Sequence, residues 1–227
     1  MSPKPLEMIP VQTGTAPPRP TPWDRLLRFA RVRPTTERCA LCGAGLTAEH
    51  AHLLELDHRR LVCACAACSI LFDRDNGSHY RRVPSRVHLL ADFDMPDPSW
   101  DDLHIPINLA FFFHSSNTGR IAAFYPGPAG ATESLLEFSS WETLVVTNPA
   151  LAELKPDIEA LLVNRIGERR DHYLVSIDEC FKLVGLIRMH WRGLSGGQDA
   201  WKRIEHFFED LQARSQSMTR AGVTAHA

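Results

Sequence analysis

The sequence lacks any long hydrophobic run. No stretch of its 227 residues approaches 18 consecutive apolar residues, and the densest short run, residues 107–113, has the length of a strand. Residues 1–5 lack the apolar segment of a signal peptide. Net charge is also small, because 25 Lys and Arg nearly balance 27 Asp and Glu and leave a formal charge of −2. We therefore expect a soluble cytoplasmic protein without membrane insertion, and the charge balance disfavours nucleic acid as a partner.

Motifs of catalysis are missing as well. The sequence contains no Gly-x-x-x-x-Gly-Lys-Ser/Thr phosphate-binding loop. No glycine-rich dinucleotide turn, catalytic-triad spacing or pair of carboxylates stands out from the rest of the sequence. We therefore predict a protein that is not an enzyme, with no catalytic residues and no organic cofactor. The hydrophobic fraction of 44% and the charged fraction of 23% are still typical of a globular chain with a sizeable core.

Proline, cysteine and charge divide the chain into five predicted segments. The first segment has seven prolines and only three charged residues, a composition that builds neither a helix nor a sheet. The predicted segments are a disordered Pro-rich arm (1–22), a short helix (23–34), a four-cysteine metal-binding ribbon (35–72), an α+β domain with a C-terminal helical hairpin (80–213) and a disordered tail (214–227).

The middle of the chain predicts a β-hairpin. Residues 104–114 form a mostly apolar stretch that is typical of a buried strand, and residues 117–119 (Asn-Thr-Gly) are typical of a turn. Residues 120–125 then give the returning strand. The Pro- and Gly-rich segment 126–131 is predicted to break that strand as a defined loop, and residues 133–144 fit either a strand or a helix.

The C-terminal part of the sequence predicts helices. Pro156 stands at a first helical position, and the apolar residues from Leu161 to Ile166 predict a helix that ends at Gly167. Two capping boxes, at residues 176–179 and 195–198, each open a further helix with apolar residues at helical spacing. The predicted fold class is therefore α+β, with a metal-binding two-knuckle ribbon, a small antiparallel sheet and a C-terminal helical hairpin.

Two Cys-x-x-Cys pairs are the most specific motif. Cys39 and Cys42 are followed, after 22 residues, by Cys65 and Cys68. This spacing lets each short segment turn tightly and direct both sulfurs toward one ion, as a tetrahedral four-thiolate site requires. In a reducing compartment such cysteines are metal ligands or buried thiols rather than disulfides. We predict that these four residues bind one metal ion, with each pair at the tip of a hairpin.

The identity of the metal follows less directly from the motif. Zinc and rubredoxin-type iron share a four-sulfur tetrahedron, but the second pair lacks the proline and glycine that rubredoxins usually place there, which favours zinc over iron. A closed four-cysteine site leaves no coordination position for substrate and is structural. The sequence leaves three roles open for Cys63: a spare core thiol, a substitute ligand or part of an iron–sulfur cluster. His50 and His52 lie between the two pairs and could also bind metal, but with four cysteines available we interpret them as exposed polar residues on a strand or turn.

Several stretches form a recognisable set: the cysteine pairs with Cys63 and residues 105–113, 124–134, 156–162, 183–188 and 191–193. Together, over residues 35–212, they resemble an uncharacterised bacterial family encoded in gene clusters for actinobacterial-type nickel–iron hydrogenases. The resemblance implies a cytoplasmic accessory role in maturation, subunit assembly or electron supply, with a hydrogenase subunit or another maturation protein as partner. It implies no catalytic residues.

Three functions remain open on these grounds. The first is a non-enzymatic assembly or maturation factor with a structural zinc ribbon, and the second is a rubredoxin-like electron carrier with iron on the same four cysteines. The third is a zinc-ribbon protein that binds nucleic acid. Residues 124–134, with Tyr125 and Glu133 near the ends of the segment, are either a rigid connector or the contact with a partner protein.

Overall fold

The computed structural model divides the chain into residues 1–36 and residues 37–227. The predicted arm and the first short helix lie outside the described residues. Within the described part, no helix is long and apolar enough to cross a membrane. The structure describes residues 37–73, 79–105, 107–134 and 138–219.

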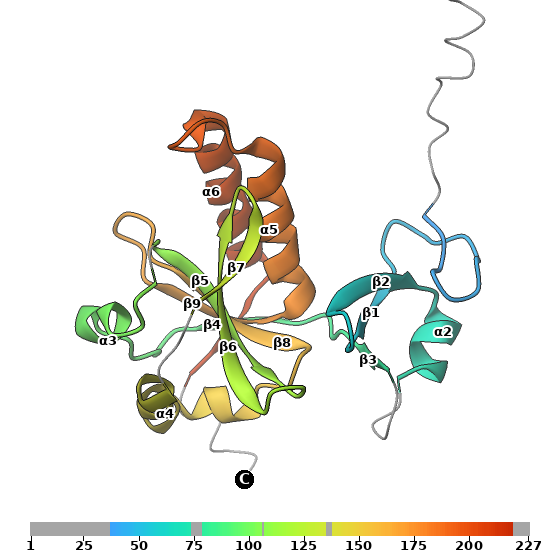
Figure 1. Ribbon diagram of the computed structural model, residues 1–227, viewed down its shortest axis with the longest axis horizontal. Coiled ribbons are helices and arrows are strands. Elements are labelled where there is room, and N and C mark those ends of the chain that lie inside the picture. Colours follow the sequence, from blue (N-terminus) through green and yellow to red (C-terminus); the bar gives the residue numbers. More distant parts are fainter. Residues whose placement is uncertain (1–36, 74–78, 106, 135–137, 220–227) are drawn as a thin grey trace, which may run out of the picture. The chain divides into compact units, whose positions relative to one another are not determined.

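A small antiparallel sheet follows the first cysteine pair. Its strands are β1 (Ala51–Glu55), β2 (Arg60–Ala64) and β3 (Tyr80–Arg82), in the order β2-β1-β3, and helix α2 (Ala66–Leu71) follows β2 (Figure 1). The predicted four-cysteine segment ended at residue 72, so β3 completes this sheet from a part of the chain that we had assigned to the next domain.

One face of the small sheet packs on the cysteines. Successive side chains of a strand point to opposite faces, and Leu53 lies opposite Val62 in the pairing of β1 with β2. These two residues form a buried cluster with Ala64, Cys39 and Cys68. The apolar cluster on this face is therefore very small, and two of its members are predicted metal ligands.

A second, larger sheet has seven strands in the order β10-β4-β9-β8-β5-β6-β7. All neighbouring strands are antiparallel except β10 and β4, which are parallel. The strands β5 and β6 confirm the predicted hairpin, since Phe111 pairs with Phe124 and Ser115 with Arg120. The bounds are Val87–Leu90 (β4), Leu109–Ser115 (β5), Arg120–Gly127 (β6), Gly130–Ser134 (β7), Glu159–Asn164 (β8), Asp171–Ser176 (β9) and Gln216–Met218 (β10).

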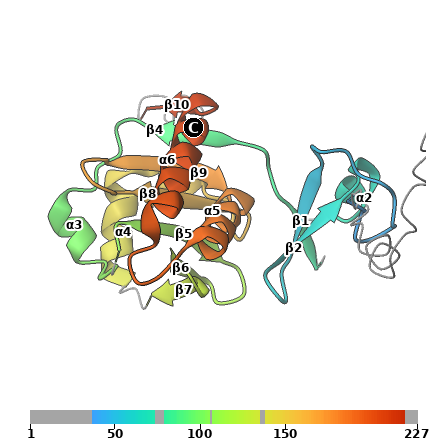
Figure 2. The same cartoon turned by 90° about the horizontal axis from the view of Figure 1, so that it is seen from above.

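Helices cover both faces of the large sheet. Phe111 and Leu162 face a cluster that includes α5 and α6, whereas Phe112 and Leu161 face a second cluster that includes α3, α4 and η1. Figures 1 and 2 show α5 and α6 side by side, away from α3 and α4. The molecule is thus a mixed α/β protein, as predicted at the level of fold class. The helices are α3 (Asp97–Asp101), α4 (Phe138–Thr147), the 3-10 helix η1 (Pro149–Glu153), α5 (Ile177–His190) and α6 (Gly197–Ala213).

The prediction of a helix after Pro156 is wrong. Residues Glu159–Asn164 form strand β8, which lies between β5 and β9, and every residue of this strand is buried. A strand that is covered on both faces reads as one continuous apolar run, and such a run resembles a buried helix in sequence. Tertiary context therefore decided the conformation of this segment.

Two other predicted boundaries are also wrong. Strand β6 continues through Pro126 to Gly127 and pairs with β7, which begins at Gly130, so the segment that we predicted as a loop is mostly a tight hairpin. Residues 216–218, which we had placed in the disordered tail, form β10 beside β4. Residues 220–227 of that tail lie outside the described residues.

Candidate metal centre

The first cysteine pair lies in a tight turn just before β1. The Cys39 backbone N–H donates to the Ala44 carbonyl over 2.8 Å, and the Gly43 N–H donates to the Cys39 carbonyl over 2.9 Å. Gly43 has a φ of +75°, in the left-handed region that glycine adopts without steric cost. The turn therefore depends on Gly43 and brings Cys39 and Cys42 to the same side of the chain.

The second cysteine pair begins a helix, and here the structure corrects the sequence prediction. We had placed both pairs at hairpin tips, but Cys65 is the N-cap residue of α2 and Cys68 lies in its first turn. The Cys68 backbone N–H donates to the Cys65 sulfur over 3.4 Å. The start of α2 therefore brings the Cys65 and Cys68 sulfurs to the same end of the helix.

The four predicted ligands come together. The sulfur atoms of Cys39, Cys42, Cys65 and Cys68 all lie within 4.8 Å of one another. Those of Cys42 and Cys65 are 3.7 Å apart. Zinc–sulfur bonds of about 2.3 Å in a tetrahedron place the sulfurs about 3.8 Å from one another. The donor set and its dimensions therefore fit a tetrahedral metal ion. All six cysteines of the chain lie in the described part, and all are free thiols.

The electrostatics of the group also fit a cation. Backbone N–H groups, that of Cys65 first, lower the pKa of the Cys39 thiol to about 6. Burial, together with hydrogen bonds from Cys65 and the other neighbouring thiols, raises the pKa of Cys68 to about 12. One thiolate in such a cluster opposes ionisation of the next, because like charges at this distance repel. A bound metal ion removes that conflict, since its charge lets all four thiols ionise.

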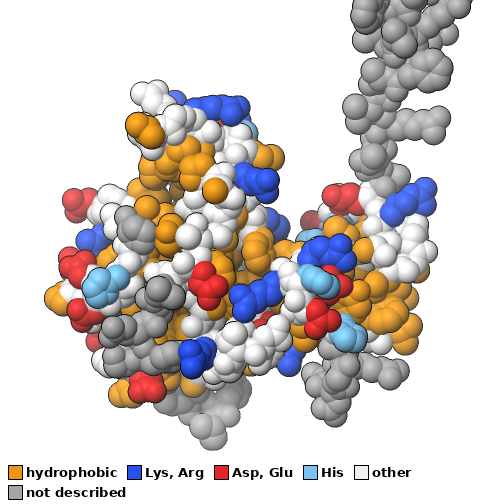
Figure 3. Space-filling view, viewed as in Figure 1, with side chains coloured by type: hydrophobic (Ala, Val, Ile, Leu, Met, Phe, Trp, Pro, Cys, Tyr) orange, Lys and Arg blue, Asp and Glu red, His pale blue; other side chains and the backbone are white. Residues whose placement is uncertain are grey.

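The group is open to solvent on one side. Cys39 and Cys68 are buried, Cys65 is partly exposed and Cys42 is exposed. Helix α2, which carries the second pair, also presents the apolar side chains of Ile70 and Leu71, 68% and 59% exposed. Figure 3 shows hydrophobic side chains gathered over this part of the molecule. An exposed apolar patch therefore adjoins the cysteine group.

The structure brings together three residues that the sequence analysis named but did not group. His50, His52 and Cys63 each offer a ligand atom, and these atoms lie within 4.8 Å of one another. The prediction that His50 is exposed is wrong, because its side chain is only 8% exposed. The signal in the sequence was the spacing of His50 and His52 by two residues, which puts both on one face of a strand.

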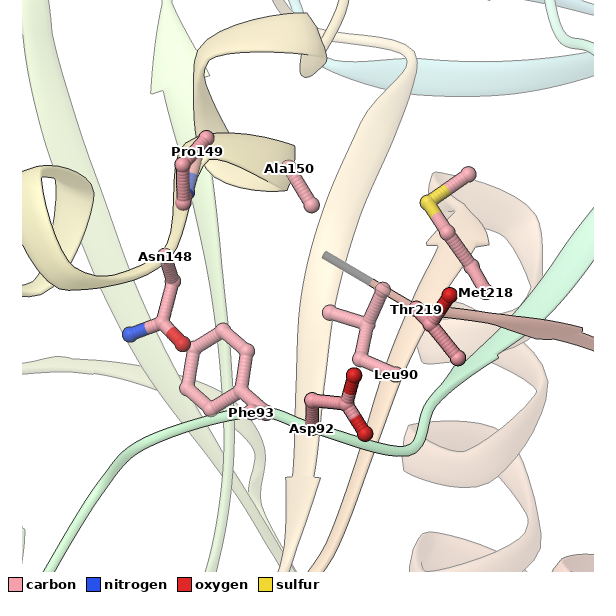
Figure 4. Close-up of a pocket in the computed structure, with 8 residues that line it drawn as sticks. All are labelled: Leu90, Asp92, Phe93, Asn148, Pro149, Ala150, Met218 and Thr219. Atoms are coloured by element: carbon pink, nitrogen blue, oxygen red, sulfur yellow. The ribbon is translucent and has the colours of Figure 1, made fainter. Parts of the chain in front are cut away.

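A small pocket lies beside the large sheet, and the hydrogen bonds at its edge join two segments of the chain. Asn148 at its edge accepts a hydrogen bond from the Asp94 backbone N–H over 2.7 Å and donates to the Asp94 carbonyl over 2.9 Å. Its amide thus holds the loop after β4 against the start of η1. Figure 4 shows the residues that line this pocket: Leu90, Asp92, Phe93, Asn148, Pro149, Ala150, Met218 and Thr219.

The fold and the site define a mixed α/β protein with a four-cysteine group that can hold a metal ion. The chain belongs to DUF5947, a family of unknown function, which matches residues 38–215. The matched segment contains both cysteine pairs and the elements from β1 to α6. Comparison with curated proteins and with solved structures finds no match.

Proposed function

We propose that this chain is a cytoplasmic, non-enzymatic accessory protein that binds zinc through Cys39, Cys42, Cys65 and Cys68. The observation that carries the proposal is the convergence of the four sulfurs at distances that suit one tetrahedral ion. Four protein thiolates occupy every position of such an ion and leave none for substrate. The metal then serves as a structural link between the turn at Cys39 and the start of α2.

The proposed client of this accessory protein is a nickel–iron hydrogenase, whose assembly or maturation it assists. This part of the proposal rests on the resemblance described for residues 35–212. The exposed apolar residues of α2 support contact with a partner, since contiguous apolar surface on a folded protein commonly marks an interaction site.

Metal analysis tests the zinc assignment. The protein purified under reducing conditions should contain zinc and should be colourless, because zinc has a filled d shell. A coloured protein with one iron per chain would instead support the rubredoxin-like electron carrier, which uses the same four cysteines.

Hydrogenase activity in cells tests the accessory role. Deletion of the gene should lower hydrogen uptake, and the wild-type gene should restore it whereas the Cys42→Ser gene should not. Unchanged hydrogen uptake after deletion would contradict the proposed role.

A pull-down from the same cells separates two partner surfaces. We expect Ile70→Ser/Leu71→Ser to lose the partner and Tyr125→Ala/Glu133→Ala to retain it, with both variants matched for thermal stability. The opposite pattern would place the contact on strands β6 and β7 instead.

A further inference from the structure

A second group of metal-ligating side chains lies on the other face of the small sheet. His52 in β1 is directly opposite Cys63 in β2, and residues paired in this way project their side chains to the same face. His50 is two residues before His52 and so shares that face. Leu53 and Val62, which pack on Cys39 and Cys68, belong to the opposite face. The β1–β2 hairpin thus separates the two groups.

The three side chains are close enough to share one ion. A ligand atom from each lies within 4.8 Å of the other two. Nitrogen and sulfur ligands of a tetrahedral zinc ion are about 3.3–3.8 Å apart, so a movement of about 1 Å closes the group around a metal. The imidazole rings of His50 and His52 are already 4.9 Å apart between centroids.

Both imidazoles are held in the orientation that metal binding requires. His50 Nδ1 lies 3.0 Å from the Thr47 carbonyl, and His52 Nδ1 lies 3.1 Å from a carboxylate oxygen of Asp178. Each acceptor fixes the proton on Nδ1, which leaves the lone pair on Nε2. Metal-binding histidines almost always have such a carbonyl or carboxylate partner on the second nitrogen.

His50 Nε2 provides an independent sign of a missing ligand. This atom is buried, and it has no hydrogen-bond partner among the described residues. Burial of a polar atom without a partner is costly, and such atoms are rare in folded proteins. A core histidine that served packing alone would gain stability from a partner at this position. A metal ion beside His52 and Cys63 would supply it.

We propose that His50, His52 and Cys63 form a second metal site, which binds a zinc-like transition-metal ion through two imidazole nitrogens and one thiolate. This donor set suits borderline metals such as zinc or copper rather than calcium or magnesium, which prefer oxygen. The proposal goes beyond the structural four-cysteine site and does not depend on the hydrogenase role.

The second site differs from the first in being incomplete. Three protein ligands leave one position of a tetrahedral ion open for water or for a ligand from outside the chain. His50, His52 and Asp178 line one cleft of the molecule, so an outside ligand in this cleft would lie beside the proposed site.

Zinc stoichiometry tests the second site. Wild-type protein, titrated with zinc against a chromophoric chelator, should bind two zinc ions per chain, whereas His50→Gln, His52→Gln and Cys63→Ser should each bind one. His58→Gln is the matched control, because His58 lies on the same hairpin with its side chain 76% exposed, and it should bind two. A wild-type stoichiometry of one, or two ions bound by Cys63→Ser, would overturn the proposal.

Cobalt spectra show that the variants remain folded and identify which site is lost. Cobalt at the first site should give the intense absorption of a tetrathiolate complex in every one of these variants. The wild type should add a second set of bands from a nitrogen–sulfur site, and Cys63→Ser should lack only these. Loss of the tetrathiolate bands in Cys63→Ser would instead make Cys63 a ligand of the first site and reject the second site.

Asp178 is a positioning residue in this proposal, since it acts through His52. Asp178→Asn should weaken zinc binding at the second site by about 10- to 100-fold, the usual effect of changing a partner of a ligating histidine. The first site should keep its affinity, and Asp199→Asn in α6 serves as the control. Equal zinc affinity of Asp178→Asn and wild type at the second site would show that the carboxylate does not position His52.

Discussion

His172 in β9 makes the stability of the fold sensitive to acid. Its imidazole is buried and stacks on Phe93, with ring centroids 4.5 Å apart. Burial, with a further contribution from the Arg165 guanidinium, lowers the pKa of His172 to about 4, against about 6.5 for an exposed histidine. Between these two values the unfolded chain binds a proton that the folded chain does not, so stability falls as the pH drops through this window.

We expect a loss of about 2 kcal/mol from this residue between pH 7 and pH 4.5, from about 1.4 kcal/mol per pKa unit. Urea unfolding of wild type and of His172→Gln at both pH values measures it. The variant, which has no titrating group at this position, should lose about 2 kcal/mol less than wild type over the same range. An identical loss in the two proteins would show that His172 does not titrate on unfolding.

Cys42 and Cys63 should respond differently to the same substitution. Cys42 is exposed, so Cys42→Ser removes little packing, yet it should release the zinc of the first site and destabilise residues 37–73. Cys63→Ser should leave the first site loaded. Zinc analysis by mass spectrometry under native conditions distinguishes the two variants. If the first site of Cys42→Ser or Cys65→Ser kept its full content of zinc, the assignment of these cysteines as ligands would be contradicted.

The sequence predicted one of the two groups of candidate ligands, and the other escaped prediction for a physical reason. When two cysteines are separated by only two residues, the short segment between them holds their sulfurs close together. Spacing alone therefore made Cys39, Cys42, Cys65 and Cys68 candidate ligands. His52 and Cys63 come together only through the register of β1 with β2, which spacing does not reveal. Histidine is also common on exposed strands, so the spacing of His50 and His52 carried little weight by itself.

The connection between α5 and α6 depends on one glycine in a crowded position. Gly196 has a φ of +85°, and a Cβ added there would lie 2.9 Å from the ring of Trp191. Gly193 in the same connection has a φ of +61° with no atom within 4 Å of an added Cβ. Both substitutions to alanine should cost about 1–2 kcal/mol for the left-handed backbone, and Gly196→Ala should cost more because the indole must move.

Thermal unfolding of Gly196→Ala and Gly193→Ala tests this difference, with tryptophan fluorescence as the probe of Trp191 and Trp201, whose ring centroids are 5.6 Å apart. The larger drop in melting temperature should belong to Gly196→Ala. Equal melting temperatures in the two variants would mean that the contact with Trp191 does not constrain the connection.

The sequence predicted correctly the helices that have apolar residues along one side only. Helices α5 and α6 have one apolar stripe, and their extents agree with the prediction to within a few residues. The expected side-chain caps do not form, since Ser176 donates instead to the Asp178 carboxylate and Gly196 is the N-cap of α6. Strand β8 was missed because burial on both faces removes the alternation by which a strand is recognised.

Metal removal should affect the two sheets of the molecule unequally. The buried cluster on the cysteine face of the small sheet contains five residues, two of which are the proposed ligands Cys39 and Cys68. A core of this size does not usually hold a fold without a metal. The large sheet has two extensive apolar clusters that contain no residue of the four-cysteine group. Chelation should therefore loosen β1, β2 and α2 and leave β5, β8 and β9 intact.

Hydrogen exchange with and without a zinc chelator measures this effect residue by residue. Amides of β1 should lose protection after chelation, whereas amides of β8 should keep it. Restored zinc should restore protection in β1, which separates metal loss from irreversible damage. Unchanged protection of β1 after complete removal of zinc would show that the metal does not stabilise the small sheet.

X-ray absorption at the zinc edge of the Cys63→Ser protein tests the central assignment most directly, because this variant should contain only the first site. The account predicts one zinc per chain with four sulfur neighbours at about 2.3 Å. Nitrogen or oxygen neighbours in place of sulfur, or a protein that holds no metal after reduction and zinc loading, would contradict a site made by Cys39, Cys42, Cys65 and Cys68.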